Sequence, residues 1–352
     1  MKKMLALLLA LVMVLSLAAC ASSQPATTDA AASTETAETT ETTETTEPAA
    51  EESAEAPAES GKTYTVGVCQ LVQHEALDAA TQGFIDALKE ELGDAVTVDA
   101  QNASGDSVNC GTIVNGFVSK GVDLIMANAT PALTAAVSAT ADIPILGTSI
   151  TAYGVALDID DFNGTVGGNV SGTSDLADLQ AQAQMILDWF PETKTVGLLF
   201  CSAEPNSRYQ IDEVRKALEA QGVTCEEFAF TDSNDVSSVT QKAADFSDVV
   251  YIPTDNTAAS NTEAIANVLI PAGVPAICGE EGLCRGCGVA TLSISYYDLG
   301  VTTGKMAAKI LKGEADISTM PVEYTDATPK YNASVCEQLG ITPLDGYEAI
   351  EG

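Results

Sequence analysis

The sequence predicts an α/β protein of two Rossmann-like, parallel-sheet lobes, joined by a hinge that the chain crosses three times, with a ligand cleft between them. Three observations support this fold class. Apolar, β-rich runs alternate with segments whose apolar residues recur at helical spacing, which is typical of parallel sheets flanked by helices. The series of runs repeats about 130 residues further along. Small polar and acidic residues follow the predicted strands, where open parallel sheets bind ligands.

The predicted elements of the first half begin with a strand at Tyr64–Leu71. In the following helix, apolar residues recur at helical spacing from Leu77 to Leu92, and Gly93 ends it because glycine is favoured just after a helix. Further along we expect, in order, a strand at 96–100, a helix at 107–119, a buried strand at 122–127, a helix from about residue 131 and a strand at 143–147. This order favours a parallel sheet with helices on both faces.

The second half repeats the strands of the first half in the same order. The matching runs are 66–68 with 196–198 at an offset of 130, 122–125 with 247–250 at an offset of 125, and 143–146 with 274–277 at an offset of 131. Helices are expected between these runs, at 207–220 and 258–269. The near-equal offsets favour two lobes of like topology over one larger sheet.

The two lobes are expected to be discontinuous in sequence. Gly164–Asp175 is rich in glycine and small polar residues, as a hinge crossing would be, and further crossings are expected near residues 293–298 and 322–330. The resulting domains are a signal peptide at 1–19, a tether at 20–61, a first lobe at 62–172 plus about 296–322, and a second lobe at 173–295 plus about 323–352.

The N-terminus has the features of an export signal. Lys2 and Lys3 precede the apolar run Met4–Leu17, which ends in Leu17-Ala18-Ala19-Cys20. A basic start, an apolar middle and small residues before the cut make a secretory signal peptide. Because cysteine follows the small residues, the segment resembles the lipobox of bacterial lipoproteins. That resemblance implies acylation of Cys20 and anchoring on the outer face of the cell membrane. An ordinary secretory signal is the alternative.

Composition excludes several classes of protein. The 352 residues include 50 acidic and 15 basic ones, for a net charge of −35, which disfavours binding to nucleic acid or to an anionic membrane surface. The only long apolar run, Met4–Ala19, has sixteen residues and is shorter than the roughly 20 that a spanning helix needs. Residues 21–60 hold ten acids and no Lys, Arg or aromatic residue, so we interpret them as a disordered tether.

The residues that follow the predicted strands are the candidate ligand-binding residues. Both lobes would direct these positions toward one cleft. Thr130 and Asn206-Ser207 are expected to cap helices whose first N–H groups can hold a carboxylate, although each capping residue taken alone can equally be structural. The candidates are Gln73, His74, Thr130, Thr148, Ser149, Ser174, Asp175, Asn206, Ser207, Asp255, Asn256, Glu280 and Tyr297, with Cys20 for the lipid and no metal site.

Five segments give the chain a specific resemblance. They are Gln70-Leu71-Val72-Gln73-His74-Glu75-Ala76-Leu77-Asp78, Ala129-Thr130-Pro131-Ala132, Asn169-Val170-Ser171-Gly172-Thr173-Ser174-Asp175, Tyr251-Ile252-Pro253-Thr254-Asp255-Asn256-Thr257 and Tyr296-Tyr297-Asp298-Leu299-Gly300. Over nearly all of Tyr64–Ile341 the chain resembles the substrate-binding lipoproteins of ABC importers with the type I periplasmic-binding fold, and especially their tryptophan/tyrosine branch. The resemblance implies that two lobes close on a small solute, commonly an amino acid and often an aromatic one, and deliver it to a permease.

The candidate residues suit an amino acid zwitterion. We expect Asp255 to accept a charge-assisted hydrogen bond from the α-ammonium group. Helix N-termini and hydroxyls such as those of Ser149 and Ser207 can hold the carboxylate without an arginine. Tyr297 or His74 would line the pocket for the side chain.

Two segments depart from the family pattern. Gln73-His74-Glu75 stands where the family usually has Glu-His-Pro, and Cys284-Arg285-Gly286-Cys287 stands where a plainer loop is usual. Both can alter which side chain is accepted, so we do not narrow the ligand to tryptophan. Of the eight cysteines after the lipidated one, Cys69, Cys201 and Cys278 are expected in or next to core strands. A loop disulfide and free thiols both stay open for Cys284 and Cys287.

An enzyme is the disfavoured alternative. His74 is the only histidine, which disfavours nucleophile–histidine catalysis and excludes a zinc site with several His ligands. The sequence has no Walker loop and no dinucleotide fingerprint. We therefore expect no catalysis and no cofactor, and a monomer that works with an ABC permease and its ATPase. A ligand sensor coupled to a receptor, or a binding protein for a solute that is not an amino acid, would have a similar sequence.

Overall fold

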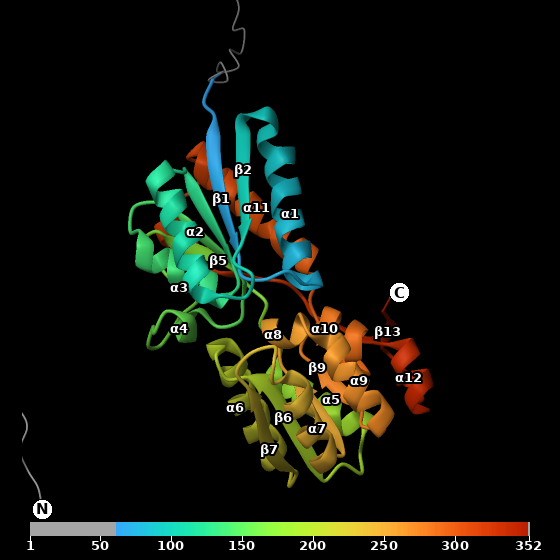
Figure 1. The fold of residues 1–352 in the computed structure, drawn as a ribbon. Coiled ribbons are helices and arrows are strands. Elements are labelled where there is room, and N and C mark those ends of the chain that lie inside the picture. Colours follow the sequence, from blue (N-terminus) through green and yellow to red (C-terminus); the bar gives the residue numbers. More distant parts are fainter. Residues whose placement is uncertain (1–60, 351–352) are drawn as a thin grey trace, which may run out of the picture. The chain divides into compact units, whose positions relative to one another are not determined.

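The computed structural model describes residues 61–350, so the predicted signal peptide, Cys20 and most of the tether lie outside the described residues. The described chain forms two sheets, one of six strands and one of seven (Figure 1). Among these residues no helix is both long and apolar enough to cross a membrane.

The six-stranded sheet has the order β11-β5-β4-β3-β1-β2, and all its neighbouring strands are parallel. We call this sheet and its helices the first lobe. Its strands are β1 (Tyr64–Gln70), β2 (Val96–Asn102), β3 (Leu124–Asn128), β4 (Ile145–Ile150), β5 (Val170–Ser174) and β11 (Glu323–Tyr324). Its helices are α1 (Glu75–Leu92), α2 (Ser107–Lys120), α3 (Thr130–Ala139), α4 (Tyr153–Ala156) and α11 (Tyr296–Lys312), with 3-10 turns at Gly93–Ala95 and Ile317–Thr319.

The seven-stranded sheet has the order β13-β12-β10-β9-β8-β6-β7, and only β10 and β12 pair antiparallel. We call this sheet and its helices the second lobe. Its strands are β6 (Thr195–Cys201), β7 (Thr224–Phe230), β8 (Val249–Ile252), β9 (Ala276–Cys278), β10 (Ala290–Ser293), β12 (Thr328–Tyr331) and β13 (Glu348–Ala349). Its helices are α5 (Leu179–Trp189), α6 (Pro205–Glu219), α7 (Val236–Phe246), α8 (Asn256–Ala259), α9 (Thr262–Ala272), α10 (Glu281–Cys287) and α12 (Ala333–Leu339).

The strands matched by the sequence repeat occupy the same places in the two sheets. The order β4-β3-β1-β2 in the first lobe corresponds to β9-β8-β6-β7 in the second. Two mainly parallel sheets of like topology, each with its own helices, confirm the predicted fold class. The chain passes between the sheets at residues 175–178, 294–295 and 325–327.

The core of the first lobe lies on both faces of its sheet. In β3, Leu124 and Met126 pack in a cluster with residues of α1 and α11. Ile125 and Ala127 point the other way and pack with residues of α2 and α3. Because successive side chains of a strand alternate between faces, a strand covered on both faces is apolar throughout. This explains the continuous apolar run that predicted the strand.

The glycine-rich segment Gly164–Asp175, expected as a hinge, instead contains strand β5. Gly172 has φ 143°, and a Cβ at this position would lie 2.0 Å from the carbonyl oxygen of Gly147 on β4. Glycine is therefore required because two strands approach closely, and the composition reflects packing within the first sheet.

Helices α1 and α11 pack against each other at glycines. A Cβ on Gly300 of α11 would lie 2.0 Å from the carbonyl oxygen of Ala80 on α1, and a Cβ on Gly83 of α1 would lie 2.1 Å from the carbonyl oxygen of Tyr297. Only glycine permits this distance between the two backbones. The contact fixes the starts of both helices, His74 and Tyr296, relative to each other.

Candidate functional site

A small cavity, with about 270 Å³ of space that includes some open to solvent, lies between strand-end loops and helix starts of the two lobes. The first lobe and the crossing that follows it contribute His74, Leu77, Ser149, Thr151, Asp175 and Tyr296, and the second lobe contributes Asn206, Thr254, Asp255, Asn256, Ala259 and Glu280. Carboxyl ends of parallel strands are the usual place for ligands in this class of fold. The cavity is therefore the candidate ligand site.

The structure brings seven of the thirteen candidate residues to this cavity. They are His74, Ser149, Asp175, Asn206, Asp255, Asn256 and Glu280. Both lobes are represented among them, which is the convergence that the sequence argument required.

Three further candidates support the cavity from behind. The Thr303 hydroxyl donates to Oγ1 of Thr148 at 3.2 Å within a buried group of threonines. Ser174 donates to a backbone carbonyl at 3.1 Å, and Ser207 forms a side-chain hydrogen bond to Asp255. These hydroxyls already have protein partners, so they position the site and do not line it.

The expected helix caps lie one or two residues earlier than predicted. Ala129, not Thr130, is the N-cap of α3, and the Thr130 side chain is buried outside the cavity lining. Glu204 is the N-cap of α6, which places Asn206 inside its first turn. Proline at the first or second helical position accounts for both shifts, because its missing N–H costs nothing there.

Gln73 and Tyr297 do not line the cavity. Gln73 is exposed and lines a neighbouring cavity nearer to solvent. Tyr297 is 44% exposed, and its hydroxyl donates to Asp86 at 3.2 Å on the outer side of α1. Its neighbour Tyr296 is 7% exposed and faces the cavity, because consecutive helical residues point about 100° apart.

Five lining residues were not among the candidates. They are Leu77, Thr151, Thr254, Ala259 and Tyr296. A signal for Tyr296 exists in the sequence, since it continues the helical stripe of Leu299, Gly300 and Thr303 that packs inward. The other four are short or apolar residues without a distinguishing pattern.

Three buried oxygens at the cavity make no hydrogen bond within the part of the chain that the structure describes. They are Oγ of Ser149, Oδ1 of Asp175 and Oδ1 of Asn206. Buried polar atoms are normally paired, and an unpaired one costs about 1–3 kcal/mol. Three such atoms from both lobes around one cavity indicate a polar ligand that supplies the missing partners.

Ser149 is held toward the cavity by an irregular stretch of β4. The pairing register of β4 with β5 shifts between Gly147 and Ile150, and Ser149 has φ 54°. A non-glycine residue in this region is strained, and such strain concentrates at functional sites. Because of this irregularity the Ser149 side chain points toward the cavity, a direction that it would not take in a regularly paired strand.

Asp175 carries the acceptor oxygen best suited to a cation. The Tyr296 hydroxyl donates to its Oδ2 at 2.9 Å and the Thr151 side chain also interacts with the carboxyl group, while within residues 61–350 no hydrogen bond of normal geometry reaches Oδ1. Burial raises the pKa of Asp175, because the charged form loses its hydration. A positive group of the ligand would restore the stability of the carboxylate.

The carboxyl oxygens of Asp255 and Glu280 already accept hydrogen bonds from backbone N–H groups. Those of Asp255 accept from the backbone N–H groups of Cys201 at 2.6 Å and Ala258 at 2.8 Å. Those of Glu280 accept from the N–H groups at residues 282 and 283, at 2.6 and 2.5 Å. Each side chain caps its own helix, α8 and α10 respectively. At this cavity Asp175 therefore offers a carboxylate oxygen with fewer protein partners than those of Asp255.

Burial also perturbs the titration of these two carboxyl groups. It raises the pKa of Asp255 to about 8, with a further contribution from the neighbouring Glu204, and it raises the pKa of Glu280 to about 7. The cavity lining contains no lysine or arginine. Three carboxyl groups thus lie in a lining without a cation, and a positive group of a ligand would favour their charged forms.

His74 connects the two lobes beside the cavity. Its Nε2 lies 3.3 Å from Oδ1 of Asn256 on α8. Burial lowers the pKa of His74, so the imidazole is neutral at pH 7. A neutral ring adds an aromatic wall and a hydrogen-bonding edge without a charge.

Helix starts at the cavity differ in their free N–H groups. Glu204 accepts from the backbone N–H groups of Asn256 and Thr257, at 3.0 and 2.9 Å, so α8 has none to offer at these positions. In α1 and α6 the N-cap side chain makes no capping hydrogen bond within the described chain. The first turns of α1 and α6 therefore retain donors that suit a carboxylate.

The Cys284-Arg285-Gly286-Cys287 segment is helical, which corrects the expectation of a loop. Both cysteines lie in α10 and are buried, and within residues 61–350 no cysteine forms a disulfide. In the same residues no group of His, Cys, Asp and Glu side chains is arranged to hold a metal ion.

A family model described as ABC transporter substrate binding protein matches residues 65–346. The chain is 33% identical over 276 residues to a protein named "Tyrosine-binding protein" from Clostridioides difficile strain R20291, which covers 77% of this chain and 79% of that protein.

Two solved structures are similar to this one at the same 32% identity. An ABC domain from Streptococcus pneumonia in complex with L-Trp has a TM-score of 0.78 and covers 82% of this chain and 100% of that one. The ligand-free, open structure of a substrate-binding protein with adhesive properties from Clostridium difficile has a TM-score of 0.63 and covers 82% and 99%. The described chain is thus more similar to the ligand-bound relative than to the open one.

Proposed function

This chain belongs to the family of ABC transporter substrate-binding proteins, and we propose that it captures an amino acid between its lobes and delivers it to an ABC permease. The observation that carries the proposal is the set of unpaired oxygens of Ser149, Asp175 and Asn206 around one buried, cation-free cavity. An amino acid offers both an ammonium donor group and a carboxylate acceptor group, and its binding would leave none of these oxygens unsatisfied.

The ammonium group would bind in the acidic part of the cavity. Oδ1 of Asp175 supplies a charged acceptor. Oδ1 of Asn206 supplies a neutral one, since its Nδ2 already donates to the Thr254 carbonyl at 3.0 Å. Asp255 and Glu280, whose pKa values are raised by burial, would lie beside the ammonium group, which would favour their charged forms.

The carboxylate would bind to the Ser149 hydroxyl and to N–H groups in the first turns of α1 and α6. No arginine is needed, because helix N-termini stabilise anions. Tyr296, His74 and the apolar Leu77 and Ala259 then remain for the side chain of the ligand. Such a lining favours an aromatic side chain, in line with the tyrosine and L-Trp named for two relatives.

Binding would act through closure of the lobes. A ligand held by Asp175 on one side and Asn206 on the other makes its full set of contacts only when the lobes are together. It therefore stabilises the closed form by its difference in affinity for the two forms. The permease would recognise this closed form, and the ligand leaves chemically unchanged.

The cell surface is the proposed location. Acylation of Cys20 would anchor the chain outside the cell membrane, and the acidic residues 21–60 would space the lobes from it. Labelling of cells with radioactive palmitate should mark the wild-type chain and not Cys20→Ala. Equal labelling of the wild-type chain and Cys20→Ala would contradict the lipoprotein assignment.

A thermal-shift screen tests the choice of ligand. The protein is heated with each of the common L-amino acids, with sugars and with polyols, all at the same concentration. A ligand at 100 times its Kd stabilises a protein by about 2.7 kcal/mol, which for a protein of this size is several degrees in Tm. We expect the largest shifts with aromatic L-amino acids. Shifts with sugars or polyols alone would refute the amino acid assignment.

A further inference from the structure

A second cavity adjoins the ligand cavity on the solvent side. The two share His74, Ala259 and Glu280 in their linings, and the second encloses about 720 Å³ including space open to solvent. Glu75 from the first lobe and Arg285 from the second also line it. This cavity therefore adjoins the ligand cavity and has linings from both lobes.

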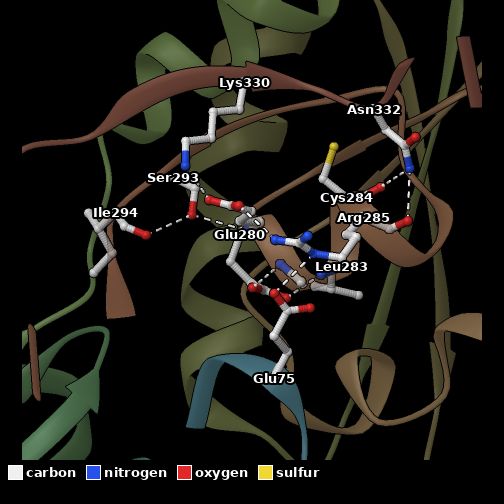
Figure 2. A network of polar contacts seen from close by, with 11 residues as sticks. Glu75, Glu280, Leu283, Cys284, Arg285, Ser293, Ile294, Lys330 and Asn332 are labelled. Carbon is white, nitrogen blue, oxygen red and sulfur yellow. Dashed lines mark hydrogen bonds and ion pairs between the residues drawn. The ribbon is translucent and has the colours of Figure 1, made fainter. Parts of the chain in front are cut away.

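An ion pair joins the lobes at this place. Nε of Arg285 on α10 lies 3.0 Å from Oε1 of Glu75, the first residue of α1 (Figure 2).

The Arg285 side chain is held in place from its own lobe. Its Nη2 lies 2.9 Å from Oε1 of Glu281, and Nζ of Lys330 on β12 lies 2.5 Å from Oε2 of the same glutamate. Arg285 thus keeps a partner in its own lobe when the lobes separate. When the lobes open, the positive charge of Arg285 would still be paired with Glu281.

The Glu75 side chain also sits on a fixed support. The preceding residue, His74, contacts Asn256 across the cleft at 3.3 Å. The glycine contact between α1 and α11 holds the start of α1 in place. Two consecutive residues of the first lobe therefore touch two different helices of the second lobe, α8 and α10.

We propose that the Glu75–Arg285 pair is an interlobe clasp, which forms when the lobes close and slows the release of the ligand. The inference rests on the proposed function for lobe closure on a small ligand, but not on the identity of that ligand. Glu75 and Arg285 are positioning residues, since the ligand cavity is not lined by either of them. Their side chains are 51% and 34% exposed, so the pair is weak enough to break in each cycle.

The test compares Glu75→Gln with a matched control, Glu91→Gln. Glu91 lies on the same helix and pairs with Lys312 of α11 at 2.7 Å, but both partners belong to the first lobe. Dissociation of radiolabelled L-tyrosine is followed after addition of excess unlabelled tyrosine, at low salt and at about 1 M NaCl. An exposed ion pair accounts for roughly a 2- to 5-fold change in rate.

We expect Glu75→Gln to release tyrosine about 2- to 5-fold faster than the wild type at low salt. The difference should vanish at high salt, because the pair is screened. Arg285→Gln should give no additional acceleration when combined with Glu75→Gln, and Glu91→Gln should match the wild type. Equal rates for Glu75→Gln and the wild type at low salt, or equal acceleration by Glu91→Gln, would overturn the clasp.

A second measurement follows the closed form itself. Hydrogen–deuterium exchange is recorded with saturating ligand for residues 254–260, which face His74 and include neither partner of the ion pair. Faster exchange of this segment in Glu75→Gln than in Glu91→Gln supports the clasp, and equal exchange contradicts it. If tyrosine does not bind, the ligand assignment fails, and the same comparison with the solute that gives the largest thermal shift decides the clasp.

Discussion

Substitution of Asp175 by Asn removes one negative charge from the cavity and keeps the shape of the side chain. Asn can still accept the hydrogen bond that the Tyr296 hydroxyl now donates to Oδ2 at 2.9 Å. At the position of Oδ1, however, it presents an NH₂ group that cannot accept from an ammonium ion. A hydrogen bond to a charged group contributes about 1.5–3 kcal/mol, so Kd for the amino acid should rise about 10- to 150-fold.

The same substitution should not destabilise the ligand-free protein. Burial raises the pKa of Asp175, so its carboxylate is less stable in the folded protein than in water. Asn carries no such cost, and Tm without ligand should stay equal or increase. The two readouts therefore move independently, which separates a binding role from a structural one.

Titration calorimetry and thermal unfolding of the same samples provide the assay. Asp86→Asn is the control, because Asp86 also accepts from a tyrosine of α11, Tyr297, but lies on the exposed side of α1. It should leave Kd unchanged. An unchanged Kd in Asp175→Asn would refute the ammonium assignment, and a loss of several degrees in Tm would show that Asp175 is mainly structural.

Two further predictions concern stability. Since the pKa of Asp255 is raised to about 8 and that of Glu280 to about 7, the folded protein binds more protons than the unfolded chain up to about pH 8, and the free energy of unfolding should fall as pH rises. His74, whose pKa is lowered, acts in the opposite direction, and its contribution fades as pH rises above its unfolded pKa of about 6.5. Denaturant unfolding at pH 7–8 therefore reports mainly the raised pKa values, and stability that increases across this window would contradict the prediction. In α11, Gly300→Ala should destabilise the protein by about 1–3 kcal/mol, because its Cβ would meet a backbone oxygen of α1. Gly116→Ala on α2, where no atom lies within 4 Å, should be neutral or stabilising; similar losses of Tm for both would refute the packing argument.

Much of the architecture was predictable because its signals are local. Strands buried on both faces show continuous apolar runs, and the duplicated topology leaves the same series of runs twice. The glycine-rich segment at 164–175 was misread for a physical reason. Glycine is needed both in flexible connections and where two backbones approach closely, and the sequence alone does not distinguish Gly172 on β5 from a hinge glycine.

The site was predicted less completely than the fold. The positions after predicted strands indicated His74, Asp175 and Asn206 as candidate ligand-binding residues, and the structure places all three at one cavity. The choice between Tyr296 and Tyr297 depends on the rotational phase of α11, which the glycine contact with α1 fixes. Whether a carboxylate is available to a ligand depends on its hydrogen bonds, and the capping role of Asp255 is not visible in the sequence.

Calorimetric titration with L-tyrosine and two analogues tests the central claim, that the cavity binds a zwitterion. Tyramine lacks the carboxylate, and 3-(4-hydroxyphenyl)propionate lacks the ammonium group, while the ring is the same in all three. We expect tight binding of L-tyrosine and a Kd at least about 10-fold higher for each analogue, because each leaves part of the buried polar lining unpaired. Binding of the propionate with the same Kd as L-tyrosine would contradict the assignment of Asp175 and the zwitterion site.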